Sequence, residues 1–262
     1  MDTESYSINR KVKNYWEIGP CGTDSFIVGK VEKYTKEWFE IIENNRYEVE
    51  PFIHQIAQFS RYQGKRVLEI GVGAGTDHLQ WARVVKDLYG CDLTDEGINI
   101  TRKRLETYGL NSNLQQHDAE NLPFDDNFFD VVYSWGVIHH SESPHKIIDE
   151  IKRVLKTQGE FIGMLYQRNS LTTLRVWIKH ALLKGKPWNS FSECIYHHVE
   201  SIGTKAYTKA EILSLFSDFS EVKITPLLTE GDVNRLPKWI VSLLPNSLGW
   251  FLGIRAKLGP QK

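Results

Sequence analysis

Apolar and polar positions change between two periods along the middle of the chain. Short apolar runs of the kind that form buried strands are each followed by a stretch with apolar residues at helical spacing. The strand-like runs are KRVLEIG at 65–71, YGCDL at 89–93, NLQQHDA at 113–119, FFDVVYSW at 128–135 and EFIGMLY at 160–166. This alternation predicts parallel strands joined by crossover helices, and therefore an open α/β sheet with helices on both faces.

Capping residues predict where several helices begin and end. Thr94 is suited to cap one helix, and Ser143 followed by Pro144 is typical of the start of another. We expect the second helix to end at Gly159, because glycine is the commonest residue just past a helix C-terminus.

The last hundred residues follow a less regular pattern. Ser170 and the Thr208–Glu211 capping box predict two helices, and the runs at 221–228 and 249–258 predict two more strands. Because no linker separates a second unit, we expect residues 1–262 to form a single domain around a seven-stranded, mostly parallel sheet.

Charge and cysteine content narrow the classes of function. The 32 basic and 33 acidic side chains nearly cancel, so nothing global favours nucleic-acid binding. Cys21, Cys91 and Cys194 are widely spaced, which argues against a disulfide framework and a zinc site and favours a reducing cytoplasm. The polar N-terminus does not resemble a signal peptide.

One apolar stretch near the C-terminus, 236–254, raises the question of membrane contact. Prolines and an asparagine interrupt it, so we expect no transmembrane anchor. Peripheral contact through Trp239 and Trp250 stays open, although we favour packing of this stretch against the sheet.

The first predicted strand ends in the glycine-rich loop GVGAGTD. Its glycines stand at 71, 73 and 75, whereas the dinucleotide fingerprint needs glycines at 71, 73 and 76, where this chain has threonine. Glu69 precedes the loop, and its carboxylate would repel a pyrophosphate. A cofactor carrying a cationic sulfonium and an ammonium group fits this loop better than NAD.

Two aspartates end the next two predicted strands. Asp92 is placed to accept hydrogen bonds from a ribose diol, and Asp118 is placed to accept one from an adenine amino group. Ligands of open parallel sheets bind at these strand ends, so the three segments predict one nucleoside site.

The segments VLEIGVGAGTD, GCDLTDEGI, HDAENLPF and FDVVYSWGVIHH together resemble class I S-adenosylmethionine-dependent methyltransferases, especially the small-molecule branch that includes quinone-biosynthesis enzymes. The resemblance is strong over 60–166 and holds only in outline elsewhere. It implies a Rossmann-like fold with one antiparallel strand, S-adenosylmethionine as the methyl donor and a small-molecule acceptor. It also implies an N-terminal arm or lid at 1–50, an acceptor-pocket insertion at 167–218 and C-terminal strands at 219–262.

The resemblance implies a set of cofactor contacts at the strand ends. Those of the methionine part are Glu69, Gly71, Gly73, Gly75, Thr76 and Asp77. Those of the ribose and adenine are Asp92, Leu93, Asp118, Ala119 and Glu120. Ser134, Trp135 and Gly136 would lie near the methionine moiety and the reacting sulfur.

Histidines supply the candidate catalytic groups. His139 and His140 follow the fourth strand and either could act as a general base, with a purely structural role as the alternative. His197 and His198 lack a cluster of further ligands, so we predict no metal. The acceptor pocket is expected to involve Tyr196, His197 and Tyr207, and Tyr15 and Trp16 either close over the cofactor or pin the arm.

Two other functions stay open from sequence alone. One is a nucleotide-dependent oxidoreductase, which the glycine spacing disfavours. The other is a non-catalytic S-adenosylmethionine-binding protein. The methyl acceptor, the atom that is methylated and the oligomeric state are not fixed by these patterns.

Overall fold

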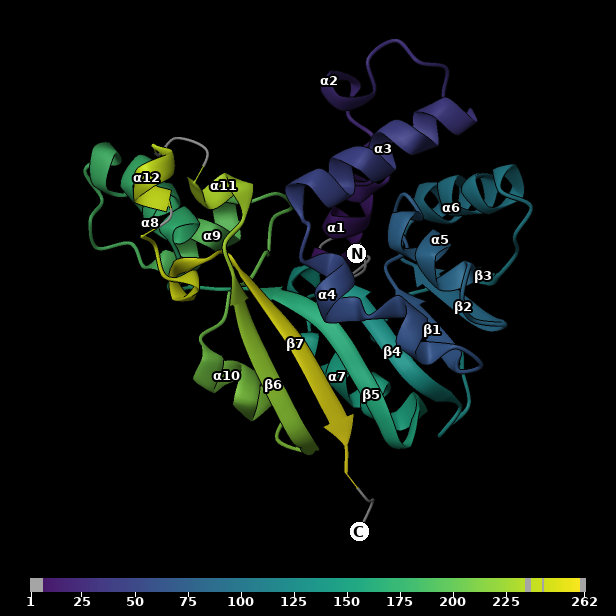
Figure 1. The fold of residues 1–262 in the computed structure, drawn as a ribbon. Coiled ribbons are helices and arrows are strands. Elements are labelled where there is room, and N and C mark those ends of the chain that lie inside the picture. Colours follow the sequence, from purple (N-terminus) through teal and green to yellow (C-terminus); the bar gives the residue numbers. More distant parts are fainter. Residues whose placement is uncertain (1–6, 234–236, 242, 260–262) are drawn as a thin grey trace, which may run out of the picture.

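The strands form one seven-stranded sheet (Figure 1). The computed structural model describes residues 7–233, 237–241 and 243–259. The strands are β1 Arg66–Ile70, β2 Asp87–Asp92, β3 Asn113–Gln116, β4 Phe129–Trp135, β5 Leu155–Tyr166, β6 Phe219–Leu227 and β7 Phe251–Leu258. Their order is β3-β2-β1-β4-β5-β7-β6, and β7 runs antiparallel to both of its neighbours. The predicted mostly parallel sheet with one antiparallel strand is confirmed.

Helices fill most of the connections between strands and the N-terminal end of the described chain. The α-helices are α1 Ile8–Trp16, α2 Ser25–Val28, α3 Lys36–Val49, α4 Ile53–Ala57, α5 Thr76–Ala82, α6 Asp95–Thr107, α7 Pro144–Val154, α8 Leu171–His180, α9 Phe191–His198, α10 Lys209–Leu215, α11 Glu230–Val233 and α12 Lys238–Val241. The 3-10 turns are η2 Phe59–Tyr62, η3 Ile138–His140, η4 Leu182–Lys184 and η5 Asn246–Leu248. The predicted caps at Thr94, Ser170 and Thr208 each accept a backbone N–H of their helix.

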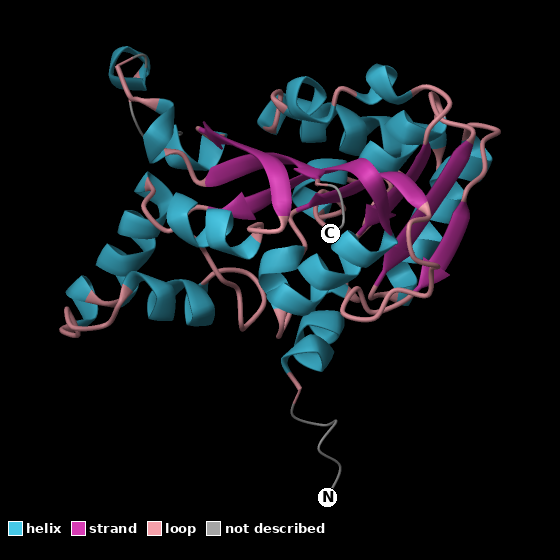
Figure 2. Ribbon diagram, turned by 90° about the horizontal axis from the view of Figure 1, so that it is seen from below, coloured by secondary structure: helices cyan, strands magenta, loops and turns pink. Residues whose placement is uncertain are grey.

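The sheet lies between two layers of helices (Figure 2). Alternate residues of β1 and β4 point to opposite faces, as a strand requires. Leu68 and Val132 pack in the core with α7 and α10, whereas Val67 and Val131 pack in the core with α4, η2 and α5. The continuous apolar runs seen in the sequence therefore belong to strands buried on both faces.

The end of α7 differs from the prediction. The helix stops at Val154, because Leu155 takes an extended conformation and pairs with Phe129 of β4. Gly159 lies inside β5 and does not cap the helix. Pairing with the sheet therefore begins four residues before the predicted stop.

The C-terminal apolar stretch divides into exposed and buried parts. Trp239 on α12 is 68% exposed, whereas Trp250 is buried and stacks on Tyr166 with ring centroids 4.3 Å apart. The favoured packing against the sheet therefore holds for Trp250 and is wrong for Trp239. Leu236 lies outside the described residues. None of the helices in the described part of the chain combines the length and apolar character that crossing a bilayer requires.

Two helical regions stand over the edge of the sheet at which β1, β4 and β5 end (Figure 1). One is formed by α1, α2 and α3, where the sequence indicated only a turn-rich arm over 1–30. The other is formed by α8, α9, α11 and α12. These regions form the surroundings of the candidate site.

Candidate functional site

Two adjoining hollows of about 250 and 220 Å³ lie at the carboxyl ends of the strands. They share Gly71, Gly73 and Trp135 in their walls. Twelve of the predicted site residues line one or both: Glu69, Gly71, Gly73, Thr76, Asp77, Asp92, Leu93, Asp118, Ala119, Trp135, Gly136 and His140. Four do not: Gly75, Glu120, Ser134 and His139.

The glycines of the first loop are needed for different reasons. Gly71 has φ +80°, and a Cβ there would lie 2.2 Å from a methyl carbon of Val137. Gly75 has φ +72°, and a Cβ there would lie 2.8 Å from the hydroxyl of Thr101. These two positions exclude side chains because of packing within the protein. Gly73 is the more open position, and its backbone faces both hollows.

Asp92 holds the first two strand-end loops together. One carboxylate oxygen accepts the Gly73 N–H at 2.9 Å, and the other accepts the backbone N–H and the hydroxyl of Thr94 at 2.9 and 2.6 Å. Burial raises the pKa of Asp92, and these hydrogen bonds oppose that shift. The residue therefore both lines the cavity and fixes the loop that Gly73 belongs to.

The N-terminal helix is fastened to the third strand-end loop. The side-chain amide of Asn9 donates to Asp118 at 3.0 Å and to Glu120 at 2.7 Å. Glu120 also accepts hydrogen bonds from Ser141 and Ser143, which together outweigh its burial and lower its pKa. Glu120 thus anchors α1 and the loop after β4, and it does not face the cavity.

Glu69 makes an unexpected buried pair with His78. Its Oε2 lies 2.9 Å from His78 Nδ1, and His78 Nε2 lies 2.9 Å from the hydroxyl of Ser112. That hydroxyl donates to the Leu88 carbonyl, so it accepts from His78 Nε2–H. His78 Nδ1 is then the acceptor, and Glu69 donates to it as a neutral acid.

The pKa directions agree with this proton placement. Burial raises the pKa of Glu69 well above its ordinary value, and burial lowers the pKa of His78 to about 3. The sequence predicted an ionised Glu69 that faces a cationic cofactor. In this structure Glu69 is a neutral acid, and its proton is directed at His78.

An arginine of α3 stands beside the methionine end of the predicted cofactor site. Arg46 pairs with Asp77 at 3.0 Å and with Glu50 at 2.8 Å, and it lines both hollows. Although burial opposes its charge, the two acids raise the pKa of Arg46 well above its ordinary value. Tyr47 and Tyr133 also donate to Asp77, so this carboxylate is fully engaged by the protein.

Sequence reasoning missed Arg46 because it did not recognise α3. The signal was present: Thr35 caps the helix, and Trp38, Phe39 and Ile42 form its buried face.

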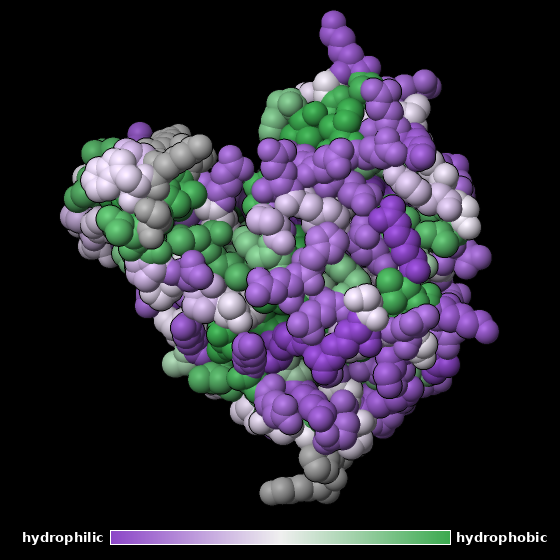
Figure 3. All heavy atoms as spheres, viewed as in Figure 1, coloured by the Kyte–Doolittle hydropathy of each residue, from purple (hydrophilic) through white to green (hydrophobic). Residues whose placement is uncertain are grey.

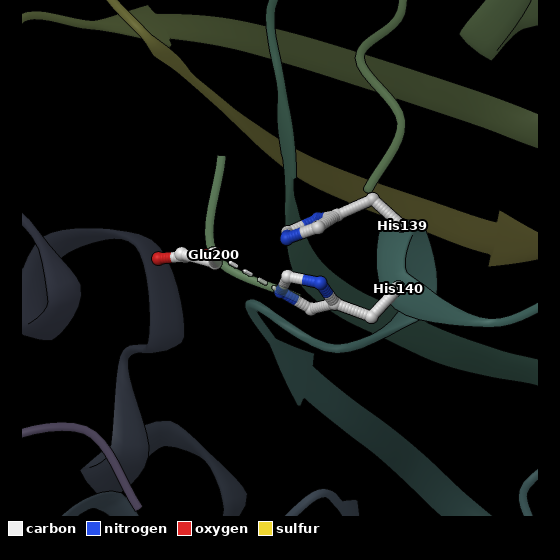
Figure 4. Close-up of side chains that lie close together, drawn as sticks. All are labelled: His139, His140 and Glu200. Carbon is white, nitrogen blue, oxygen red and sulfur yellow. Dashed lines mark ion pairs between the residues drawn. The ribbon is translucent and has the colours of Figure 1, made fainter. Parts of the chain in front are cut away.

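His139, His140 and Glu200 form a cluster at the other end of the cavity (Figure 4). His140 Nε2 lies 3.2 Å from a carboxylate oxygen of Glu200. The hydroxyl of Tyr166 donates to the same carboxylate at 2.9 and 3.0 Å. The sequence did not single out Glu200, which lies in the loop after α9 and shows no motif around it.

The two histidines have different surroundings. His139 is fully buried, stacks on Tyr166 at 3.8 Å, and neither of its ring nitrogens has a hydrogen-bond partner among the described residues. Burial, and then electrostatic interaction with His140 and Lys205, lower the pKa of His139 far below its ordinary value. Only His140 faces the cavity.

Two hydroxyl groups, those of Thr204 and Ser201, each lie 3.0 Å from Nδ1 of His140. Thr204 already donates to the Ser201 carbonyl at 2.7 Å, so it accepts from an Nδ1–H, whereas the Ser201 hydroxyl can donate to an unprotonated Nδ1. The other ring nitrogen, Nε2, lies beside Glu200. These contacts fit both tautomers of His140.

Aromatic side chains complete this end of the cavity. Trp16 of α1 meets His140 edge to face at 5.4 Å, and Tyr166 and Phe251 line the same wall. The predicted pocket residues Tyr196, His197 and Tyr207 line neither hollow, and Tyr15 is 44% exposed. Of the two arm aromatics, Trp16 is therefore the one at the site.

Comparison with known proteins finds a methyltransferase domain in this chain. Residues 68–163 match the family described as methyltransferase domain, a segment that runs from β1 through most of β5. Residues 68–163 therefore form a methyltransferase domain. The sequence motifs that suggested this class all lie in or next to the matched segment.

Several curated relatives share this methyltransferase segment. The chain is 37% identical over 98 residues to the uncharacterized methyltransferase YcgJ of Bacillus subtilis, covering 37% of this chain and 39% of that protein. It is 36% identical over 122 residues to a fatty-acid O-methyltransferase of Mycolicibacterium smegmatis, covering 46% of this chain and 43% of that protein. The chain thus spans about two fifths of the length of these relatives. A ubiquinone biosynthesis O-methyltransferase of Cereibacter sphaeroides is 28% identical over 185 residues, covering 63% and 75%.

Solved methyltransferase structures share the fold over a longer span. The crystal structure of Bacillus subtilis YcgJ superposes with a TM-score of 0.56 at 18% identity, covering 81% of this chain and all of that one. The N-methyltransferase NodS of Bradyrhizobium japonicum, solved with S-adenosyl-L-homocysteine, gives a TM-score of 0.55 at 17% identity, covering 81% and 87%.

Proposed function

We propose that this chain transfers a methyl group from S-adenosylmethionine to a small-molecule acceptor. One observation carries the proposal. A single cavity has the strand-end residues Gly73, Asp92 and Ala119 in one part of its wall and His140 with Glu200 in another. A cofactor held by the first group would present its methyl to an acceptor beside the second.

The cofactor end of the cavity offers complementary groups for each part of the donor. Asp92 keeps lone pairs for ribose hydroxyls while holding Gly73, and Asp118 with Ala119 would recognise the adenine edge. Arg46 lines the hollow at the predicted methionine end, where it would pair with the cofactor carboxylate. S-adenosylmethionine supplies the electrophilic methyl and the leaving group. The protein therefore has only to align the donor with the acceptor and to exclude water.

His140 is the group we propose as the general base. It would take the proton of an acceptor hydroxyl on Nε2, the acceptor oxygen would bond to the methyl carbon, and the carbon–sulfur bond would break with its electron pair going to sulfur. Glu200, 3.2 Å away, would stabilise the imidazolium that forms. His139 is a poor candidate because it lies outside the cavity and burial disfavours its charged form.

The walls favour an apolar acceptor that carries oxygen. Trp16, Met164, Tyr166 and Phe251 surround the His140 end. Two relatives are named O-methyltransferases, one of fatty acids and one of ubiquinone biosynthesis. We therefore propose a hydroxyl or carboxyl group on a lipophilic molecule as the acceptor.

Incubation with methyl-labelled S-adenosylmethionine and cell extracts tests this function. Extracts are separated into aqueous and organic-soluble fractions, and mass spectrometry identifies what gains the label. We expect a labelled product in the organic fraction that depends on wild-type protein and is absent with His140→Gln. Binding of the cofactor without any labelled product would favour the non-catalytic alternative.

A further inference from the structure

The turn between α8 and α9 exposes large apolar side chains to solvent. All seven residues over 182–188 are exposed. Leu182, Leu183 and Trp188 are 46%, 74% and 77% exposed, values far above those of apolar residues in the core. We call this segment, Leu182–Trp188, the apolar tip. In Figure 1 it belongs to the region of α8 and α9, and Figure 3 shows hydrophobic side chains on the surface of that region.

The apolar tip is an ordered turn and not an extended loop. Gly185 has φ +68° and donates its N–H to the Leu182 carbonyl at 3.1 Å, while the Lys186 N–H donates to the Ala181 carbonyl at 2.9 Å. At its base, the indole of Trp177 donates to the Asn189 carbonyl at 2.8 Å. These bonds present the apolar side chains outward from a defined backbone.

The segment that contains the apolar tip carries only positive charges up to Glu193, which lies in the first turn of α9. From Asn169 to Ser192 the sequence contains Arg175, Lys179, Lys184 and Lys186 and no aspartate or glutamate. The three lysines are exposed, and none forms an ion pair with another residue of the described chain. Burial, and then the positive charges of His198, Lys179 and Lys184, lower the pKa of His180 at the end of α8.

Exposed leucine and tryptophan among unpaired lysines match the chemistry of one kind of surface. Lipid bilayers accept leucine and tryptophan at the boundary between headgroups and acyl chains, and anionic headgroups attract lysine. We propose that the apolar tip docks this chain on anionic lipid bilayers. This surface differs from the stretch around Trp239 that the sequence indicated for membrane contact.

The tip is connected to the candidate site by one short helix. α9 begins three residues after Trp188 and ends two residues before Glu200, and eight helical residues span about 12 Å. A docked tip would hold the acceptor end of the cavity near the bilayer surface. Lipid docking itself does not depend on methyl transfer, so it can be tested separately from the proposed function.

Vesicle cosedimentation of the full chain tests the proposal. The vesicles consist of phosphatidylcholine alone or of phosphatidylcholine with about one third phosphatidylglycerol. We expect binding to the anionic vesicles at least about tenfold tighter than to the neutral ones, and weaker binding at high salt. Leu183→Ser with Trp188→Ser should lower binding at least about tenfold, and Lys184→Glu with Lys186→Glu should remove the preference for anionic lipid.

A matched pair on α10 controls for nonspecific effects. Leu213 is 49% exposed, and Lys209 is exposed one turn before it. Leu213→Ser with Lys209→Glu should bind vesicles as the wild type does, and all variants should bind S-adenosylmethionine equally. Wild-type vesicle binding by both tip variants would overturn the proposal. A wild-type dimer in the absence of lipid, measured by light scattering and lost only in the tip variants, would also overturn the proposal. That result would show that the tip binds a second copy of this chain.

Discussion

Hydrogen bonds within the protein determine the chemical state of single residues at the site. Ser112 sets the protonation of His78 and thereby makes Glu69 a neutral donor. At His140, the hydroxyls of Thr204 and Ser201 both contact Nδ1, and Nε2 lies beside Glu200. At His78, a hydroxyl that has already donated its proton fixes the tautomer of the imidazole.

The Glu69–His78 pair predicts that a substitution at Glu69 raises the free energy of unfolding by an amount that depends on pH. We expect Glu69→Gln to stabilise the protein relative to wild type, increasingly as pH rises above about 4.5, because glutamine donates to His78 without titrating. The folded pKa of Glu69 is raised above its unfolded value, so its stabilising contribution is complete below the unfolded pKa of 4.5 and is lost as pH rises through the folded pKa. The difference in unfolding free energy should grow by up to about 1.4 kcal/mol per pH unit.

Urea denaturation of the two proteins between about pH 5 and pH 8 measures this difference. A difference that stays constant across that range would show that Glu69 has the same pKa in the folded and unfolded states.

The two neighbouring histidines are expected to respond differently to substitution. His140→Gln should lower turnover by about 10²- to 10⁴-fold, the usual contribution of a general base, with unchanged affinity for S-adenosylmethionine. His139→Leu should leave turnover within a few fold of wild type, because it replaces an unpaired buried imidazole with an apolar side chain of similar size.

Turnover of both variants with the identified acceptor checks this assignment. A chelator should leave wild-type turnover unchanged, since we assign a proton and not a metal to the His140–Glu200 pair. Loss of activity in His139→Leu alone, or on chelation, would contradict the base assignment.

At the scale of elements, α1 is fastened over the cavity by contacts at both of its ends. Asn9 donates to Asp118 and Glu120, and the Glu142 N–H donates back to its side-chain oxygen at 2.7 Å. Trp16 at the other end of α1 contacts His140. The position of α1 is thus coupled to both ends of the cavity.

Removing the Asn9 side chain should loosen α1. We expect Asn9→Ala to speed proteolysis in the turn after α1 and to weaken S-adenosylmethionine binding about tenfold, because hydrogen bonds to two carboxylates are lost. Limited proteolysis with and without S-adenosylmethionine, together with calorimetry, measures both effects. Lys13→Ala is the matched control on the same helix, since its ion pair with Asp95 is exposed and should contribute little. Equal proteolysis of the two variants would exclude Asn9 as the fastening residue.

Elements with strong local signals were predictable from the sequence. The buried strands β1, β4 and β5 and the caps at Thr94, Ser170 and Thr208 are apparent from apolar runs and side-chain chemistry. The end of α7 was not predictable in this way, because pairing of Leu155 with β4 is a tertiary effect that overrides the glycine signal. The helix α3 was missed, although its cap and buried face follow ordinary rules.

At the scale of the whole molecule, the fold brings together residues far apart in the sequence. The strand-end residues were predictable, because in a parallel sheet they must meet at one edge. Arg46, Trp16 and Glu200 were not, because their positions depend on how the two helical regions pack over that edge. The same limit applies to Glu120 and Ser134, which are next to cavity residues in sequence but do not line the cavity.

The central claim is that the cavity holds S-adenosylmethionine, and calorimetric titration tests it most directly. Wild-type protein should bind one S-adenosylmethionine per chain and should give no saturable heat with NAD. Asp92→Ala should weaken binding at least about 100-fold, because hydrogen bonds to a charged acceptor are lost, whereas Asp95→Ala, a substitution at an exposed position nearby, should not. Saturable binding of NAD with none of S-adenosylmethionine, or unchanged affinity in Asp92→Ala, would contradict this account.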